Sequence, residues 1–131
     1  ADAYKELAKA GFDAQESLRA MPGLLALAAA AGGDLATATE TVSTSLKAFK
    51  LDVSESGRFA DVLAQGANRS AADVGDLGAA LKQVAPVAAV TNNSLEDTTA
   101  LLSILANNAV RGADAGSDLR GILSRLTDPS K

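Results

Sequence analysis

The sequence predicts an all-α fold, a compact bundle of about seven to eight short helices arranged as antiparallel helical hairpins. Apolar residues recur at spacings of three and four along most of the chain, and no segment alternates with the period of a β-strand. Helix-capping patterns, glycines and prolines interrupt these stripes at short intervals. Of the 131 residues, 47% are hydrophobic but only 3% are aromatic, so closely approaching helix backbones must form the core.

We expect one helical domain over residues 1–131, cut from a longer protein. The length suits a single domain. The first residues already carry a helical stripe of Tyr4, Leu7 and Ala8, and no initiator methionine precedes them. The stripe stops at Gly11, a residue type that suits the left-handed position after a helix.

A second helix is predicted from the capping-box spacing of Asp13 and Glu16. Pro22 should end or kink it, because proline lacks an amide hydrogen and clashes with the preceding turn. Residues 24–31 are then apolar on nearly all sides, which predicts a short helix at the centre of the core. The pair Gly32-Gly33 stops this short helix.

The clearest amphipathic helix follows the predicted N-cap Asp34. Its apolar stripe consists of Leu35, Ala38, Val42, Leu46 and Phe49, with threonines and serines between them. Because threonine and serine are indifferent helix formers, burial of the stripe must stabilise this helix. Ser54 is predicted to start the next helix, which ends near Asn68.

Two more helices are predicted from cap patterns at Ser70 and Ser94, each with an acidic residue three positions later. Pro86 should kink or end the first of them. The segment Gly33-Asp34-Leu35 is echoed by Gly75-Asp76-Leu77, which hints at duplicated hairpins. The fixed period that a solenoid needs is missing from the sequence, so the echo is weak evidence for a repeat.

Gly112 and Gly116 form the most distinctive local pattern of the chain. Gly112 is predicted to close one helix, and Asp114 or Ser117 to open the last one. A phosphate-binding turn at a helix N-terminus is one interpretation, but no lysine accompanies it and Asp114 would repel phosphate. We therefore expect a tight corner where two helix backbones touch.

The composition argues against an enzyme. The chain contains no histidine and no cysteine, which excludes a histidine-activated nucleophile and thiolate metal ligands. The pairs Asp73/Asp76 and Asp114/Asp118 could serve acid–base chemistry or bind a divalent cation, but acids in a first helical turn also offset the helix dipole. We therefore predict no catalytic residue, no metal site and no cofactor.

The charge and hydropathy patterns exclude two further classes. The net charge is −4 and the basic residues are scattered, so no specific nucleic-acid site is expected. The longest apolar run, residues 24–31, is too short to span a bilayer. The residues predicted to matter are structural ones at helix ends and corners, namely Gly11, Pro22, Gly33, Pro86, Gly112 and Gly116.

A series of short segments follows one another in the order of a known family's motifs. They include Leu7-Ala8-Lys9-Ala10-Gly11-Phe12, Met21-Pro22-Gly23-Leu24-Leu25, Ala48-Phe49-Lys50-Leu51 and Arg111-Gly112-x-x-Ala115-Gly116-x-x-Leu119-Arg120. Together they resemble the core region of phage tail tape measure proteins, over residues 5–127. The place usually filled by Gly-Ile-Lys-Gly is Ala109-Val110-Arg111-Gly112 here.

The resemblance implies a structural role in the tail of a phage or prophage, in tail length determination, tail assembly and genome ejection. It implies a place in the lumen of the virion tail, and in the bacterial host cytoplasm during assembly. The implied partners are other copies of the chain, tail tube and tail tip proteins, and assembly chaperones. Because the helices are interrupted, we expect a folded module rather than the extended ruler. The alternative is a membrane-active segment in which residues 24–31 and 101–109 insert during DNA ejection, in transient contact with a membrane.

Overall fold

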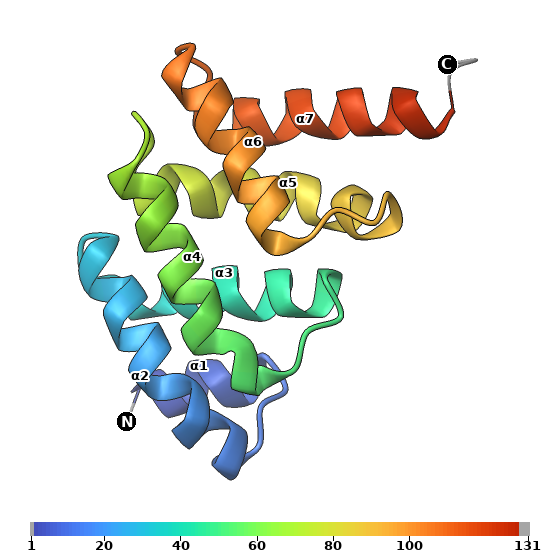
Figure 1. Ribbon diagram of the computed structural model, residues 1–131. Helices are drawn as coiled ribbons and strands as arrows, with labels where there is room; N and C mark the ends of the chain where they lie inside the picture. Colours follow the sequence, from blue (N-terminus) through green and yellow to red (C-terminus); the bar gives the residue numbers. More distant parts are fainter. Residues whose placement is uncertain (1, 129–131) are drawn as a thin grey trace.

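The computed structural model describes residues 2–128, and every regular element in that range is helical (Figure 1). The elements are α1 (Asp2–Lys9), α2 (Ala14–Ala30), α3 (Leu35–Ala48), the 3₁₀ turn η1 (Val53–Glu55), α4 (Ser56–Asn68), α5 (Val74–Val90), α6 (Leu95–Asn107) and α7 (Gly112–Thr127). The predicted all-α bundle of seven to eight helices is confirmed for the described residues.

The odd-numbered helices α1, α3, α5 and α7 form one layer of the molecule. In Figure 1 they lie one above another, and their order along the layer is the order in the chain. Lys47 Nζ of α3 donates to the carbonyl of Ala10 at 2.8 Å. A Cβ added to Gly78 of α5 would lie 3.0 Å from a methyl group of Thr41 in α3. The most extensive helix–helix contact of the described residues is the next one, between α5 and α7.

The even-numbered helices α2, α4 and α6 form the second layer and cross in front of the first (Figure 1). A Cβ added to Gly23 of α2 would lie 2.9 Å from the Ser56 carbonyl oxygen of α4. A Cβ added to Gly66 of α4 would lie 2.8 Å from Thr99 of α6. Because each even helix packs on the next one, small residues are required where two backbones approach closely.

The two layers repeat with a nearly constant spacing in the sequence. The N-cap residues of α3, α5 and α7 are Asp34, Asp73 and Arg111, which lie 39 and 38 positions apart. The even helices end at Ala30, Asn68 and Asn107, again 38 and 39 positions apart. Stacked helical pairs of nearly constant length are the arrangement of an α-solenoid.

The sequence echo was therefore a sign of a real repeat, but in the wrong register. Asp34 caps α3, whereas Asp76 lies inside the first turn of α5. The structural counterpart of Asp34 is Asp73. The two segments look alike because helical residues follow both aspartates. Asp34, however, is the N-cap of α3, whereas Asp76 is the third residue of α5.

Three of the predicted helix starts are confirmed. Asp13 and Glu16 form a complete capping box, with the Glu16 amide donating to Asp13 Oδ1 at 2.8 Å. Asp34 accepts from the amide of Ala36 at 3.1 Å. Ser94 Oγ accepts from the amide of Asp97 at 3.0 Å.

Three predicted starts were wrong. Neither Asp114 nor Ser117 opens α7, which already begins at Gly112 with Arg111 at its N-cap. Ser54 does not open α4, because Asp52 caps the 3₁₀ turn first by accepting from the Ser54 amide. Ser70 does not open α5, because its hydroxyl donates to the carbonyl of Gly66 at 2.8 Å and so belongs to the end of α4. Asp73 caps α5 instead.

Neither internal proline ends its helix, which was one of the two outcomes predicted from the sequence, to end the helix or to kink it. Pro22 lies inside α2 and Pro86 inside α5. Both are exposed. On the solvent side of a helix, the carbonyl that proline leaves without a partner can bond to water, so the helix continues past the ring.

Five helices end in the same way, with a residue of positive φ followed by a backbone bond that spans the last turn. This is the Schellman arrangement. The residues are Gly11 (φ 94°), Gly32 (94°), Lys50 (56°), Asn92 (62°) and Ala109 (68°). In the fifth case the Val110 amide donates to the Leu105 carbonyl at 2.9 Å, so α6 ends before Gly112. The prediction that Gly112 closes this helix was wrong, since Gly112 is the first residue of α7.

The core lies between the two layers, around Phe59, Leu63, Leu77 and Leu81, none of which exceeds 1% exposure. Residues 24–31 are not the predicted centre of it, because Leu25 is 53% exposed and α2 is an outer helix. The residues at its centre belong to α4 and α5. Helix α3, which lies between α1 and α5 in the odd layer, also buries the hydroxyl residues Thr39, Thr41, Ser43 and Ser45.

Candidate functional site

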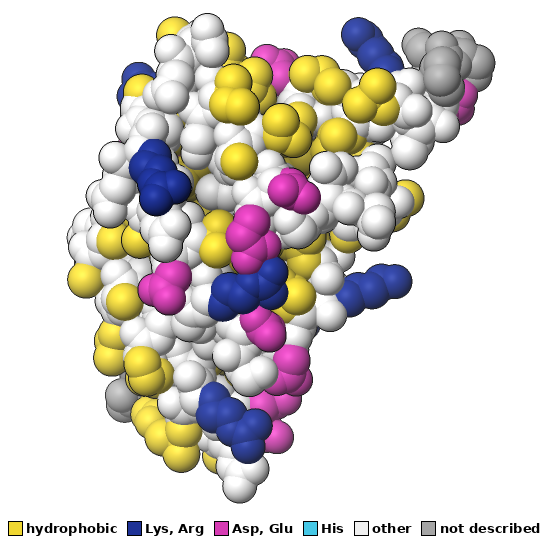
Figure 2. Space-filling model, viewed as in Figure 1, with side chains coloured by type: hydrophobic (Ala, Val, Ile, Leu, Met, Phe, Trp, Pro, Cys, Tyr) yellow, Lys and Arg dark blue, Asp and Glu magenta, His cyan; other side chains and the backbone are white. Residues whose placement is uncertain are grey.

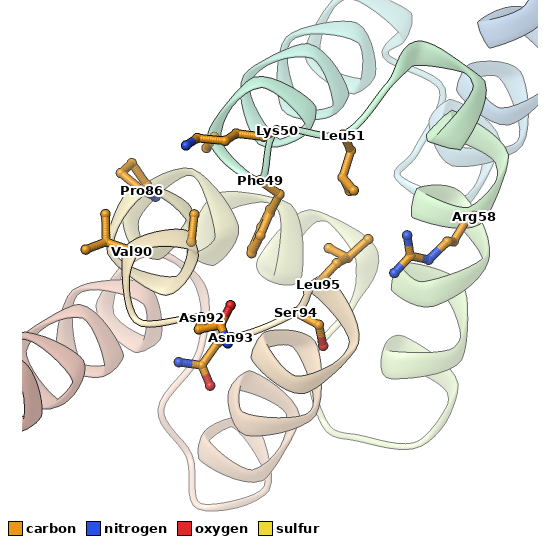
Figure 3. Close-up of a pocket in the computed structure, with 12 residues that line it drawn as sticks. Phe49, Lys50, Leu51, Arg58, Pro86, Val90, Asn92, Asn93, Ser94 and Leu95 are labelled. Carbon is orange, nitrogen blue, oxygen red and sulfur yellow. The ribbon is translucent and has the colours of Figure 1, made fainter.

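The largest cleft among the described residues, about 600 Å³, opens at the C-terminal ends of α3 and α5. It exists because α5 has 17 residues and α3 only 14, so the two helices do not end together. Figure 3 shows Phe49 and Leu51 on one side, Pro86 and Val90 on another, and Leu95 beyond them. The surroundings of the cleft are therefore mainly apolar.

Polar and charged groups lie at the rim of this cleft. They are Lys50, Arg58, Asn92, Asn93 and Ser94. Lys50 and Asn92 are both held in left-handed conformation at helix ends. Asn93 donates through its side-chain amide to Thr91 Oγ1 at 2.7 Å. Most of the rim is thus part of the two turns that end α3 and α5.

Arg58 is the only rim residue with an ionic partner among those that the structure describes. Its Nε and Nη2 donate to the two carboxylate oxygens of Glu96 at 2.6 and 2.7 Å, and its Nη1 to Glu55 at 3.1 Å. The hydrogen bonds from Arg58 lower the pKa of Glu96, and those to Glu96 and Glu55 raise the pKa of Arg58. Glu96 and Glu55 already compensate the charge of Arg58, and the contact between Arg58 and Glu96 joins α4 to α6.

The cleft can receive an apolar side chain. Of the two acidic pairs that the sequence analysis considered, Asp73/Asp76 bonds to the backbone. The Asp76 amide donates to Asp73 Oδ1 at 2.7 Å, and the Asp73 amide to Asp76 Oδ2 at 3.2 Å, so this pair is the capping box of α5. Asp114 and Asp118 are exposed on α7. Over the described residues, no three acidic side chains gather in a way that could hold a metal ion.

The six residues predicted to be structural do not form one site. Gly11, Gly33 and Gly112 have φ angles of 94°, 95° and 62° in turns at helix ends. The prolines Pro22 and Pro86 lie on the outside of their helices.

Gly116 lies where α7 meets α5. A Cβ there would lie 2.8 Å from Ala80 Cα and would also meet the Ala80 carbonyl oxygen. The sequence analysis missed Gly23, where a Cβ would also meet the backbone of another helix, and Gly66 and Gly78, where it would meet side chains of neighbouring helices. The 38-position spacing of Gly78 and Gly116 could have revealed one of them.

No described helix is both long enough and apolar enough to cross a bilayer. The two segments considered for insertion are partly buried, with Leu24, Leu27 and Leu102 at 1 to 3% exposure. Their apolar faces are used in the contacts between the helix layers.

Comparison with known proteins identifies the class to which this helical stack belongs. The family model of phage-related minor tail proteins matches residues 1–131. The chain therefore belongs to that family, whose members are proteins of phage tails.

The relatives make the identification more specific. The chain is 44% identical over all of its 131 residues to the tape measure protein of Pneumococcus phage Dp-1, of which it covers 11%. It is 32% identical over 124 residues, 95% of the chain, to the probable tape measure protein of Escherichia phage P2, of which it covers 15%. A third relative, the probable tape measure protein of Clostridium phage phiCD119, is 40% identical over 67 residues, 51% of the chain and 7% of the relative. The expected resemblance to tape measure proteins is confirmed.

The chain spans only about a tenth to a seventh of the two relatives that it matches over most of its length. No solved structure matches it.

Proposed function

We propose that the chain is a structural module of a phage or prophage tail tape measure protein, with a part in tail length determination, tail assembly and genome ejection. The observation that carries this proposal is the match of the whole chain to a tape measure protein at 44% identity. The mainly apolar cleft and the capping box formed by Asp73 and Asp76 support a structural rather than a catalytic role.

The folded module contributes little length of its own. One repeat, residues 34–72, would reach about 58 Å as a single helix at 1.5 Å per residue. Stacked as in the structure, it adds one helix to each layer, which is about 8 to 10 Å. The ruler is then formed by other parts of the parent chain, and this module is a folded body attached to it.

The place and partners follow from the same proposal. During tail assembly the module is in the bacterial host cytoplasm. In the finished virion it lies with the parent chain in the lumen of the tail. Its partners are tail tube and tail tip proteins, assembly chaperones and other copies of the chain. The cleft at the ends of α3 and α5 is the site on this module most suited to an apolar side chain of such a partner.

A deletion of one repeat in the intact phage tests the proposal. Removal of residues 34–72 joins Gly33 to Asp73, which then caps α5 as Asp34 caps α3. We expect tails that are shorter by about 10 Å at most, measured as mean tail length by electron microscopy. Shortening by about 58 Å would mean that the module is extended in the tail. Normal tails after deletion of the whole module would refute the proposed role.

The control removes about half a repeat, residues 24–42, and so breaks the register of the stack. This deletion joins the middle of α2 to the middle of α3, two helices of different layers, and breaks the layer contacts. We expect an unfolded module and misassembled tails. A mild effect equal to that of the in-register deletion would show that the repeat boundaries have no significance in the phage.

A further inference from the structure

Helix α7 is the last helix of the odd layer among the described residues, and one of its apolar sides is open. Ile122 is 48% and Leu126 72% exposed, although Leu119 and Leu123 of the same helix are 4% and 5% exposed. Figure 2 shows hydrophobic side chains gathered on the visible face of the region that α7 forms in Figure 1. The helix therefore has one buried apolar side and one open apolar side.

A comparison with α5, position by position from the N-caps, shows which residues of α7 are uncovered. Eight residues of α5 are buried. Four of their counterparts on α7 are buried as well, namely Ala115, Gly116, Leu119 and Leu123. The counterpart of Val74 is the partly buried Gly112. The remaining three counterparts are exposed, and they are Asp118, Ile122 and Leu126.

Asp118, Ile122 and Leu126 form one stripe along the helix, here called the α7 stripe. They stand seven, eleven and fifteen positions after the N-cap Arg111, and residues four apart lie on one side of a helix. The same stripe of α5 consists of Ala80, Val84 and Ala88, none of which exceeds 1% exposure. On α3 its first two residues are Thr41 and Ser45, at 5% and 0% exposure. The stripe is thus buried on α3 and α5, each of which has a later odd helix against it.

The contact made at the first residue of the stripe has the same register both times that it occurs. The residue five positions after the N-cap of one odd helix meets the residue seven positions after the N-cap of the helix before it. On α5 this residue is Gly78, where a Cβ would lie 3.0 Å from a methyl group of Thr41. On α7 it is Gly116, where a Cβ would lie 2.8 Å from Ala80 Cα. The same register places the next contact of this kind at Asp118.

Gly121 is a second sign of a missing neighbour on this side of α7. A Cβ added there would meet nothing within 4 Å, so no contact inside the described chain requires glycine. Glycine inside a helix is nonetheless less favourable than alanine. The counterpart of Gly121 on α5 is Gln83, whose Cβ would lie 2.8 Å from a Cβ added to Gly116. The bare backbone at Gly121 therefore leaves room at the position where the next odd helix would approach.

We propose that the α7 stripe is covered by a further helical pair of the parent protein, which continues the repeat. The N-cap of its odd helix lies about 38 or 39 positions after Arg111, the spacing of the earlier N-caps. A small residue five positions after that N-cap packs against Asp118, as Gly116 packs against Ala80. Both helices of the pair contact α7, as α6 and α7 both contact α5.

The size of the relatives and the direction of the stack favour this occupant. The chain covers only 11% of the Dp-1 tape measure protein, which it matches over its whole length, so a further pair of about 38 residues is a small part of what lies outside the match. In a stacked repeat each unit contacts its neighbours in the sequence. The proposal rests on this repeat and not on any role in tail length, so it can fail while the proposed function stands.

Thiol reactivity at Ile122 tests the proposal in the parent protein. The variant Ile122→Cys should react with a maleimide about tenfold more slowly or less in the purified parent protein than in the 131-residue chain, because a buried thiol reacts only when its contact opens. Mass spectrometry assigns the reaction to this site, and circular dichroism checks that both proteins are folded. Equal rates at the two lengths would overturn the proposal.

The matched control is Ala113→Cys on the same helix. Ala113 is exposed, and its counterpart Gly75 is exposed even on the covered helix α5. The control should therefore react at the same rate in the parent protein and in the 131-residue chain. Equal slowing of both variants in the parent protein would mean that α7 as a whole is hidden, and would overturn the assignment to the stripe.

A pair of cysteines identifies the occupant. In the parent protein, Asp118→Cys is combined with a cysteine five positions after the next N-cap and oxidised under mild conditions. A disulfide within one chain is expected, because residues in such a contact come within disulfide distance. Moving the second cysteine by two positions turns it to another side of its helix and should abolish the link. A link between two copies of the protein, or no link at all, would show that the following pair is not the occupant and that the proposal is wrong.

Discussion

The contact between α5 and α7 can be tested at Gly116. In the variant Gly116→Ala, the new methyl group would lie 2.8 Å from both Ala80 Cα and Gln83 Cβ, and would also meet the Ala80 carbonyl oxygen. Ala80 is part of the α5 backbone, so the clash cannot be removed by a side-chain rotation. The two helices must separate along the most extensive interface of the described residues.

The expected size follows from two opposing effects. Overpacking of this kind costs about 1 to 3 kcal/mol or more, while alanine in a helix gains about 1 kcal/mol over glycine. Because the clash is with backbone atoms, we expect a cost of about 2 to 3 kcal/mol and thus a net loss of about 1 to 2 kcal/mol in the free energy of unfolding. For a chain of this length, that lowers Tm by about 4 to 8 °C. Gly116→Val should destabilise the module further, because its side chain is larger and branched.

Urea and thermal unfolding, followed by circular dichroism, measure the effect. The matched control is Gly121→Ala in the same helix, where a Cβ meets nothing within 4 Å. It should gain up to about 1 kcal/mol from helix propensity alone. If both variants are equally stabilised, α7 does not lie against α5 as the structure has it, and the reasoning is refuted.

Four further outcomes are expected. Lys50→Gly and Ala109→Gly should each stabilise the chain by about 0.5 to 1 kcal/mol, because both residues have positive φ; a loss of stability in urea unfolding would contradict this. Ser45→Ala should raise the unfolding free energy by about 1 kcal/mol, since the fully buried Ser45 hydroxyl has no hydrogen-bond partner, whereas the cap variant Ser94→Ala should lower it by about 1 kcal/mol. Arg58→Met should cost at most about 1 kcal/mol at pH 7, because both partners are more than a third exposed. The pKa of Glu96 is lowered in the folded chain, so the stability from the Arg58–Glu96 pair is present above the ordinary pKa of 4.5. It is lost as the pH falls through the lowered pKa of the folded chain. A difference in unfolding free energy between Arg58→Met and the parent that persists at pH 2 would contradict this account.

The sequence was a good guide wherever a helix is controlled by its own residues. The capping box of Asp13 and Glu16 and the caps Asp34 and Ser94 need only backbone groups within three positions. Such local bonds depend on residue type and spacing alone. They could therefore be predicted without knowledge of the rest of the fold.

The predicted starts at Ser54 and Ser70 failed locally, because Asp52 and Asp73 provide competing caps within three positions. The two alternatives left open at the prolines and the failure in α3 involve contacts between distant segments. Whether Pro22 and Pro86 break their helices depends on the side that faces solvent, which only the packing decides. The buried hydroxyl residues of α3 were expected between the positions of its apolar stripe rather than in the core. They are buried because α3 lies between other helices of its layer.

The repeat itself was hidden by unequal helix lengths. α3 has 14 residues, α5 has 17 and α7 has 16, so motifs at the ends of the helices drift in spacing while the N-caps stay 38 to 39 positions apart. The same difference in length opens the cleft between α3 and α5. No residue motif marks that cleft, so it could not be found from the sequence.

The stacked arrangement also determines how the module responds to a pulling force. Each helix of the odd layer contacts the one before and the one after it, so the stack can be taken apart one helical pair at a time. A chain drawn lengthwise from its N-terminal end would first lose α1, which makes limited contacts with α2 and α3. The strong pair α5 and α7 would separate last. Separation of one helical pair at a time requires a lower peak force than simultaneous rupture of all contacts. The extent of each helix–helix contact determines the order in which the helices separate.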